Sequence, residues 1–142
     1  MVTNDKWVEV LRTINEHVHS VQRVAPSGVA GIPVTSHGNA WTLGDFSNDI
    51  IATDFVPLIF DIHGIDVQDP SANANFELVL YYGAGDIECG RITFTRTNPT
   101  LFSRPSQIQT PIVPAGSRVR AKLMDSTGGS SCTVKIWYHT YL

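Results

Sequence analysis

The sequence predicts an all-β protein, a jelly-roll-like antiparallel β-sandwich built as a single domain over residues 1–142. The chain has 11 glycines and 8 prolines, which separate short runs rich in valine, isoleucine, threonine, phenylalanine and tyrosine, a pattern typical of strands and turns. Several runs alternate apolar and polar residues, the period of a strand with one buried face. No internal repeat or long linker marks a second domain.

Seven strands are expected between residue 40 and the C-terminus. They span Ala40–Leu43, Asp49–Ala52, Val56–Val67, Phe76–Tyr82, Ile87–Thr95, Ser117–Met124 and Cys132–Tyr141. A further extended piece is expected at Ile108–Val113, where Pro111 restricts it to a sheet edge or a turn because proline donates no backbone hydrogen bond.

Alternation in two of these runs identifies the expected core. The core-facing residues are Val56, Leu58, Phe60 and Ile62 in the first run and Phe76, Leu78, Leu80 and Tyr82 in the second. The stretches "DPSANAN" and "STGGSS" contain residues that tolerate positive φ or bond their own backbone, so both are expected to form hairpin-type turns.

Residues 5–22 allow two interpretations. Six apolar residues fall at the spacing of an amphipathic helix, namely Trp7, Val10, Leu11, Ile14, Val18 and Val21. The β-branched content of "WVEV" and "VHSVQRV" instead favours two short strands, the second ended by Pro26. Long loops are expected near 25–39 and 96–111, and loops of that length are usually functional or mobile, so they are candidate contact arms.

Charge and composition exclude several partners. The net charge of -3 and the isoelectric point near 5.9 lead us to expect no nucleic acid and no membrane partner, because both require a basic excess. The sequence contains no apolar run of about 20 residues and no signal-peptide pattern, so we expect synthesis in the cytoplasm. Cys89 and Cys132 form no C-x-x-C pair and are expected to be reduced, packed thiols.

The histidines give only a weak indication of a metal site. His17 and His19 form an H-x-H pair, which would place both rings on one face of a strand, but no suitably spaced carboxylate follows before Asp45. His63 and His139 each stand alone in a strand and are expected to be structural. We therefore expect no metal ligands.

Other chemical motifs are weak or missing. Asp61, Asp66 and Asp69 lie close together, but their spacing does not match a calcium-binding loop and is typical of a turn. The sequence contains no G-x-S-x-G elbow, P-loop or G-x-G-x-x-G fingerprint. We expect no enzymatic activity, no catalytic residues and no cofactor.

The C-terminal strand presents residues that need cover on both faces. Val134, Ile136 and Tyr138 share one face, while Lys135, Trp137, His139 and Tyr141 share the other. The first face is expected to join the core. The second is a candidate partner interface formed by Trp137, His139 and Tyr141, because tryptophan and tyrosine are enriched at interfaces. Trp7 is a further candidate, either in that interface or as cover for the same face within the chain.

A basic triplet precedes this strand. Alternation places Arg118, Arg120 and Lys122 on one face, with the apolar residues between them facing the core. Such a face is either solvated, where its charges block stray strand pairing, or a docking surface for an acidic partner. The second interpretation requires the triplet to lie beside the aromatic face of the last strand.

Several segments resemble small structural proteins of tailed bacteriophages, of the capsid decoration or cement type. They are "NAWTLGDF" (39–46), "DIIATDFVPLIFDIHGI" (49–65), "FELVLYYGAGD" (76–86), "PIVPAGSRVRAKLMDSTGG" (111–129) and "YHTY" (138–141). The resemblance covers about the last two-thirds of the chain. Its most specific part runs from "PAGSRVRAKL" through the glycine-rich turn to the aromatic last strand. It implies a jelly-roll-like sandwich whose N-terminal segment forms strands.

The resemblance also implies a function and a location. It implies a homotrimer in the virion, on the outer surface of the capsid, that clamps neighbouring subunits of the major capsid protein. One alternative is a carbohydrate-binding or host-attachment module in which Trp41, Trp137 and Tyr81 or Tyr82 stack on sugars. Another is a sandwich metalloenzyme that uses His17 and His19.

Overall fold

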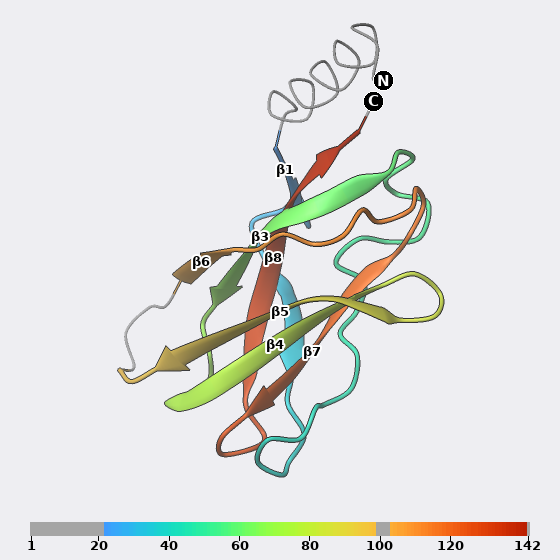
Figure 1. The fold of residues 1–142 in the computed structure, drawn as a ribbon. Helices are drawn as coiled ribbons and strands as arrows, with labels where there is room; N and C mark the ends of the chain where they lie inside the picture. Colours follow the sequence, from blue (N-terminus) through green and yellow to red (C-terminus); the bar gives the residue numbers. More distant parts are fainter. Residues whose placement is uncertain (1–21, 99–102, 142) are drawn as a thin grey trace, which may run out of the picture.

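The structure is a computed structural model and describes residues 22–98 and 103–141 (Figure 1). The described residues form eight strands and no helix. The strands are β1 (Arg23–Ala25), β2 (Ile32–Thr35), β3 (Phe60–Gln68), β4 (Ala74–Tyr82), β5 (Ile87–Arg96), β6 (Ser103–Gln107), β7 (Val119–Asp125) and β8 (Ser131–Thr140). The predicted all-β class is confirmed. The two interpretations of residues 5–22 fall almost wholly outside the described residues.

The strands form two antiparallel sheets that pack as a sandwich. In the five-stranded sheet, β3 lies between β6 and β8, and both β1 and β2 pair with the other edge of β8. The second sheet has the order β5-β4-β7. Figure 1 shows the three-stranded sheet crossing in front of the five-stranded one. This arrangement confirms the expected jelly-roll-like sandwich.

The core lies between the sheets. Phe60 and Ile62 of β3 are fully buried, as are Leu78 and Leu80 of β4. Full burial of one such side chain stabilises the fold by about 1.5–3 kcal/mol. The expected core face of β4 is confirmed, with Tyr82 partly buried at its end.

The start of β3 differs from the prediction. The strand begins at Phe60 and not at Val56, which is buried outside it. Leu58 was expected in the core but is 39% exposed. Pro57 interrupts the run, and proline is unfavourable inside a strand because it cannot complete the hydrogen-bond ladder.

A β-bulge divides β3. The pairing with β8 shifts between Ile62 and Gly64, which leaves His63 as the extra residue. Ile62 and Ile65 are therefore both fully buried, although strict alternation would place them on opposite faces. The same shift places Asp61, His63 and Gly64 together on the outer side of the sheet.

The segment after β6 bonds the backbone of this bulge. Ile108 N donates to His63 O at 3.0 Å, and Ile62 N donates to the Thr110 hydroxyl at 2.9 Å. Val113 then forms an isolated bridge with β3. The extended piece expected at Ile108–Val113 thus continues along the edge of β3 beyond the end of β6.

Residues 41–51 cover the free edge of β7. Four backbone N–H groups donate to β7 carbonyls at 2.7–2.9 Å, from Trp41 to Asp125, Gly44 to Leu123, Ser47 to Ala121 and Ile50 to Val119. The donors are three residues apart and the acceptors two apart, so the segment lacks the two-residue period of a strand. The strands expected at Ala40–Leu43 and Asp49–Ala52 are therefore wrong, apart from a single bridge at Ile51.

Two short edge strands, β2 and β6, were not expected because they contain Pro33 and Pro105, and proline inside a short run argues against a strand. β1 overlaps the end of the second short strand expected before Pro26. The loops expected near 25–39 and 96–111 contain β2 and β6, respectively. The two cysteines are free and buried, as expected, and burial raises the pKa of each thiol to about 12.

The turn between β7 and β8 is organised by Asp125, whose side chain is fully buried. Its carboxylate accepts hydrogen bonds from Thr127 N at 2.8 Å, the Thr127 hydroxyl at 2.6 Å and Gly128 N at 2.6 Å, and also from the Ser36 hydroxyl. Burial alone raises the pKa of Asp125, but these hydrogen bonds outweigh it and lower the pKa to about 2. A turn is present at "STGGSS", and the residue after β2 is tied to it, but the expected hairpin is wrong because β7 and β8 lie in different sheets. The same correction applies to "DPSANAN", which connects β3 to β4 across the two sheets.

Candidate functional site

The outer face of the five-stranded sheet carries a groove of about 840 Å³. It lies where β3 and β8 meet β6 and the segment that follows β6. Its walls include His63, Gly64, Gln107, Gln109, Trp137 and His139. The groove thus brings two of the predicted interface residues, Trp137 and His139, together with residues that were not predicted to belong to a site.

Trp137 lies across Gly64 of the neighbouring strand. A Cβ atom at position 64 would lie only 2.6 Å from Cε3 of the indole ring, so the ring packs where other residues carry a side chain. Trp137 is half-buried in consequence. One part of the indole ring packs against Gly64, and another part lines the groove.

Asp61 is the buried acid beneath the groove, with only 1% of its surface exposed. Its Oδ2 atom accepts hydrogen bonds from the Tyr141 hydroxyl at 2.7 Å and from Gln109 Nε2 at 3.0 Å. Burial, the hydrogen bond to Asp61 and the negative charge of Asp61 raise the pKa of Tyr141 to about 12. The tyrosine therefore remains a hydrogen-bond donor at neutral pH. This contact joins the third predicted interface residue of β8 to the site.

His63 and His139 meet beside this acid. His63 Nε2 lies 2.8 Å from Oδ1 of Asp61, and the two imidazole centroids are 4.1 Å apart. One ligand atom from each of the three residues lies within 4.8 Å of the others. The two histidines stand alone in their strands of the sequence, and the structure brings them side by side; their expected structural role stays a prediction. Asp61 and His63 are two residues apart on β3 and share its outer face, and the antiparallel register pairs Asp61 with His139 of β8.

The basic triplet lies on the other side of the sandwich. Arg118 and Arg120 form ion pairs with Asp86 at 3.3 and 2.6 Å. Arg120 and Lys122 also lie over the Phe46 ring, at 3.8 and 4.2 Å from its centroid. Because β7 and β8 belong to different sheets, the triplet does not lie beside the aromatic face of β8. The condition for the docking interpretation is not met.

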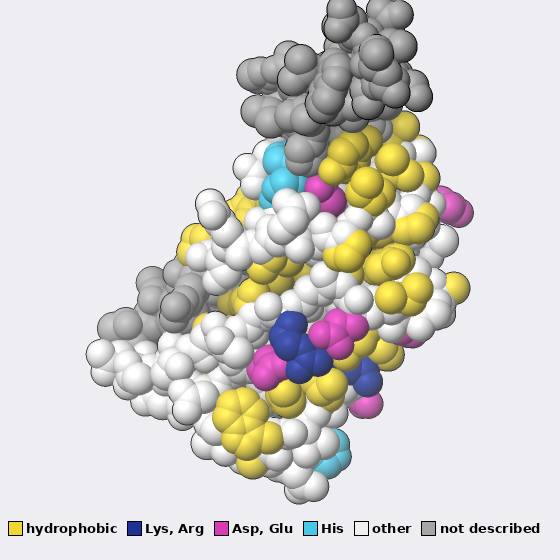
Figure 2. Space-filling view, in the orientation of Figure 1, with side chains coloured by type: hydrophobic (Ala, Val, Ile, Leu, Met, Phe, Trp, Pro, Cys, Tyr) yellow, Lys and Arg dark blue, Asp and Glu magenta, His cyan; other side chains and the backbone are white. Residues whose placement is uncertain are grey.

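The outer face of the three-stranded sheet is largely paired within itself. The guanidinium of Arg91 bonds the carboxylates of Glu77 and Glu88. The pKa of Asp86 is lowered, mainly by its hydrogen bond from Arg120. Figure 2 shows the basic and acidic side chains of this face in contact with one another. Such a face is typical of a solvated surface.

The remaining predicted groups are either outside the described residues or away from the groove. Trp7, His17 and His19 lie outside the described residues. Asp66 accepts a hydrogen bond from Gln68 at 2.7 Å, and Asp69 adopts a positive φ of 48° in the turn after β3. These two aspartates therefore have the roles of an ordinary strand and turn, and the calcium interpretation receives no support.

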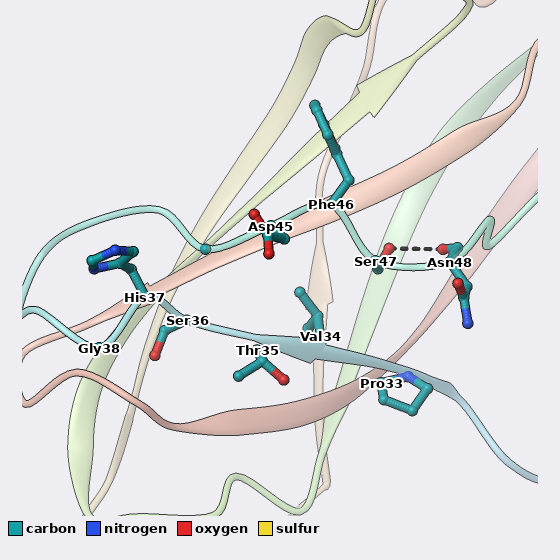
Figure 3. Close-up of a pocket in the computed structure, with 11 residues that line it drawn as sticks. Pro33, Val34, Thr35, Ser36, His37, Gly38, Asp45, Phe46, Ser47 and Asn48 are labelled. Atoms are coloured by element: carbon teal, nitrogen blue, oxygen red, sulfur yellow. Dashed lines mark hydrogen bonds between the residues drawn. The ribbon is translucent and has the colours of Figure 1, made fainter.

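A second hollow, of about 520 Å³, lies between β2 and residues 44–48. Figure 3 shows that His37, Asp45 and Phe46 point in different directions around it, with Phe46 directed away from β2. The hydrogen bond drawn there joins the Ser47 hydroxyl to the Asn48 carbonyl. The hollow offers no convergent set of polar side chains, so it is a weaker candidate than the groove.

Exposed apolar side chains before β3 were also missed by the sequence analysis. Phe55, Leu58 and Ile59 are 62%, 39% and 44% exposed, and Ile112, in the segment after β6, is 54% exposed. Apolar side chains gather at the upper right of Figure 2. Pro57 in "DFVPLIF" was the signal that these residues do not continue a buried strand.

The histidine pair offered a fainter signal. Asp61 and His63 are two residues apart, and such residues share one face of a strand. The pairing of that strand with the C-terminal strand, some 75 residues later, could not be read from local pattern. His139 therefore had no visible partner in the sequence.

Comparisons with known proteins show a shared fold. No protein-family model matches the chain, and no curated protein is similar to it in sequence. A chain from the T13 particle of infectious bursal disease virus aligns over 85% of this chain with 11% identity and a TM-score of 0.51. A carbohydrate-binding module of Cellvibrio mixtus lichenase 5A, solved with cellotriose, aligns over 86% of this chain and 88% of its own, with 16% identity and a TM-score of 0.43.

The first likeness establishes the sandwich fold and nothing more, because the identity is low. The chain spans about a third of the length of the viral chain, of which 31% is covered. Within the described residues, no helix is long and apolar enough to cross a membrane.

Proposed function

We propose that this protein is a virion structural protein of the capsid decoration, or cement, type. It binds the outer surface of a tailed-phage head as a homotrimer and stabilises contacts between subunits of the major capsid protein. The groove face of the five-stranded sheet, with half-buried Trp137 at its centre, carries the proposal. The sandwich fold shared with a chain of a viral particle is compatible with a place in a virion.

The groove face suits protein contact for physical reasons. Trp137 is a large aromatic residue held against a sheet, so little conformational entropy is lost when a partner covers the remaining ring surface. Gln107 adds an exposed residue to the wall of the groove, while the amide nitrogen of Gln109 is bonded to Asp61 and to the Thr110 carbonyl. Weak contacts of this kind become strong when many copies act on one particle.

The exposed apolar residues before β3 supply a second surface, suited to self-association. Phe55 and Ile59 are 62% and 44% exposed, and a symmetric oligomer buries such a repeated patch in every subunit. We assign the trimer contact to this surface and the capsid contact to the groove face.

The proposal includes no enzymatic activity. Both thiols are buried and have a pKa of about 12, so they are poor nucleophiles. The arginines of the three-stranded sheet are engaged with acidic neighbours on the same face.

Co-sedimentation with heads tests the proposal. Purified protein is mixed with heads that lack it, and its mass is measured separately in solution. We expect saturable binding to heads and a solution mass of about three times 15.6 kDa. Phe55→Ser should reduce the solution mass but keep binding to heads. Trp137→Ser should weaken binding to heads but keep the solution mass of the trimer. A strict monomer that ignores heads would overturn the proposal.

A carbohydrate-binding role is the second candidate, favoured by an aromatic ring beside amide side chains in one groove. The wider set of aromatics does not converge. Trp41 lies in the segment along β7, and Tyr81 packs against Phe46 on the outer side of the three-stranded sheet. Binding to a glycan array that is lost in Trp137→Ser would favour this candidate, and a silent array would count against it.

A further inference from the structure

We propose that Asp61, His63 and His139 form a binding site for a divalent transition-metal ion, with Zn²⁺ as the best match. The site is independent of the capsid role, because it requires only side chains of this chain. Neither the sequence pattern nor the shared fold assigned it.

The geometry is close to that of a metal site. One ligand atom from each of the three residues lies within 4.8 Å of the others, and the shortest of these separations, from Asp61 Oδ1 to His63 Nε2, is 2.8 Å. Zinc binds imidazole nitrogen and carboxylate oxygen at about 2.0–2.2 Å, which places ligand atoms of a tetrahedral site about 3.4 Å apart. Binding of an ion would require the three ligand atoms to move to that spacing from their present separations of up to 4.8 Å.

The donor set selects the class of metal. Two imidazoles and one carboxylate suit zinc and related transition metals, whereas calcium and magnesium require more oxygen ligands. Three protein ligands leave a fourth position open, as in zinc sites that hold water or a further ligand. Since His63 and His139 both line the groove, that position faces a space of about 840 Å³.

The surroundings orient the carboxylate. Asp61 is almost fully buried, and Tyr141 and Gln109 both donate to Oδ2. The other oxygen, Oδ1, is the one directed at His63. Outer hydrogen bonds that fix a ligating carboxylate are a regular feature of metal sites. The two-residue spacing on β3 places His63 beside Asp61, and the strand register pairs Asp61 with His139.

Metal titration of the isolated full-length chain tests the site. After removal of metals with a chelator, Zn²⁺ is titrated by calorimetry, and Co²⁺ is added as a coloured probe of tetrahedral coordination. We expect one ion per chain, visible absorption from bound Co²⁺ and a higher melting temperature with Zn²⁺. Mg²⁺ at the same concentration should have no such effect.

Variants locate the ion. His139→Ala and His63→Gln should each weaken Zn²⁺ binding by at least about tenfold, with far-UV circular dichroism confirming that each variant is folded. His37→Ala is the matched control, because His37 is exposed and far from the groove residues in the sequence. A double variant, His17→Ala with His19→Ala, tests the H-x-H pair.

Two results would overturn the inference. One is folded wild-type protein that binds no Zn²⁺. The other is binding that survives in both groove variants but is lost in the double variant or in His37→Ala. Heads take no part in these measurements, so failure of the metal site leaves the capsid proposal standing, and the reverse also holds.

Discussion

The two outer faces of the sandwich are built on opposite principles. On the three-stranded sheet, Arg91 bonds two glutamates and Arg120 bonds Asp86 while lying over Phe46. On the five-stranded sheet, a tryptophan and two histidines line a groove above a buried aspartate. The first face satisfies its charges internally, and the second directs groups toward an open space. The difference teaches that strand alternation alone does not identify the functional face.

Two buried aspartates show the same contrast. Asp125 of β7 is closed in by donors from its own turn and from Ser36. Asp61 of β3 is bonded on one oxygen by Tyr141 and on the other side meets His63 at the groove. One acid holds a turn in place, and the other is positioned for binding.

The largest effect is expected from Gly64→Val, which breaks the groove face directly. The new side chain would meet the indole ring of Trp137 at 2.6 Å and must displace it. We expect the free energy of unfolding to fall by about 1–3 kcal/mol, with binding to heads reduced at least about tenfold. Gly28→Val is the matched control, since a Cβ at Gly28 meets nothing within 4 Å. Equal loss in both variants would contradict the role given to Gly64.

Acid should act on the three-stranded side through Asp125. The pKa of this residue falls from 3.8 to about 2 in the folded protein, so its stabilising contribution is present above pH 4 and is lost as the pH falls from about 4 to about 2. The contribution at neutral pH is about 2 kcal/mol. Urea unfolding of Asp125→Asn and wild type at pH 7 and pH 2.5 measures it. The difference between the two proteins should be near that value at pH 7 and should shrink at pH 2.5. A difference that does not depend on pH would contradict this account.

A smaller effect is expected from Tyr141→Phe, which tests whether the Tyr141 hydroxyl orients the carboxylate of Asp61. Removing the hydroxyl takes one donor from Oδ2 and keeps the hydrogen bond from Gln109. We expect a loss of about 1 kcal/mol in unfolding free energy and Zn²⁺ binding weaker by about tenfold, measured by calorimetry. Tyr82→Phe is the control, because Tyr82 lies at the end of β4 in the other sheet. Unchanged Zn²⁺ affinity in Tyr141→Phe would show that the hydroxyl does not orient the site.

The smallest effect is expected from Asp86→Asn on the three-stranded face. Asp86 has a positive φ of 48°, which asparagine tolerates, and its ion pairs are at the surface. We expect a smaller loss of stability than in Asp125→Asn and unchanged binding to heads, measured by co-sedimentation. Loss of head binding in Asp86→Asn would place the capsid interface on the three-stranded sheet, which contradicts the proposal.

The strands were predictable where the sequence alternates apolar and polar residues with the two-residue period of a strand. β4, β5, β7 and β8 carry long alternating runs, and their positions were found to within a few residues. The segment along β7 was not, because its hydrogen bonds follow a three-residue spacing. Short edge strands such as β2 carry too few residues for a pattern.

The site was predictable only in part. Alternation placed Trp137, His139 and Tyr141 on one outer face of β8, and the structure shows all three beside the groove or bonded to Asp61. The bulge at His63 and the glycine beneath Trp137 depend on which strands pair, and that pairing is a property of the whole fold. For the same reason, the sequence could not show that the basic triplet and β8 belong to different sheets.

Imaging of the intact particle tests the central claim most directly, because it shows which face of the sandwich touches the capsid. We predict that the groove with Trp137 is buried against the major capsid protein, while Arg120 and Asp86 face solvent. A particle in which the face of Arg120 and Asp86 is buried and the groove of Trp137 is open to solvent would contradict the account.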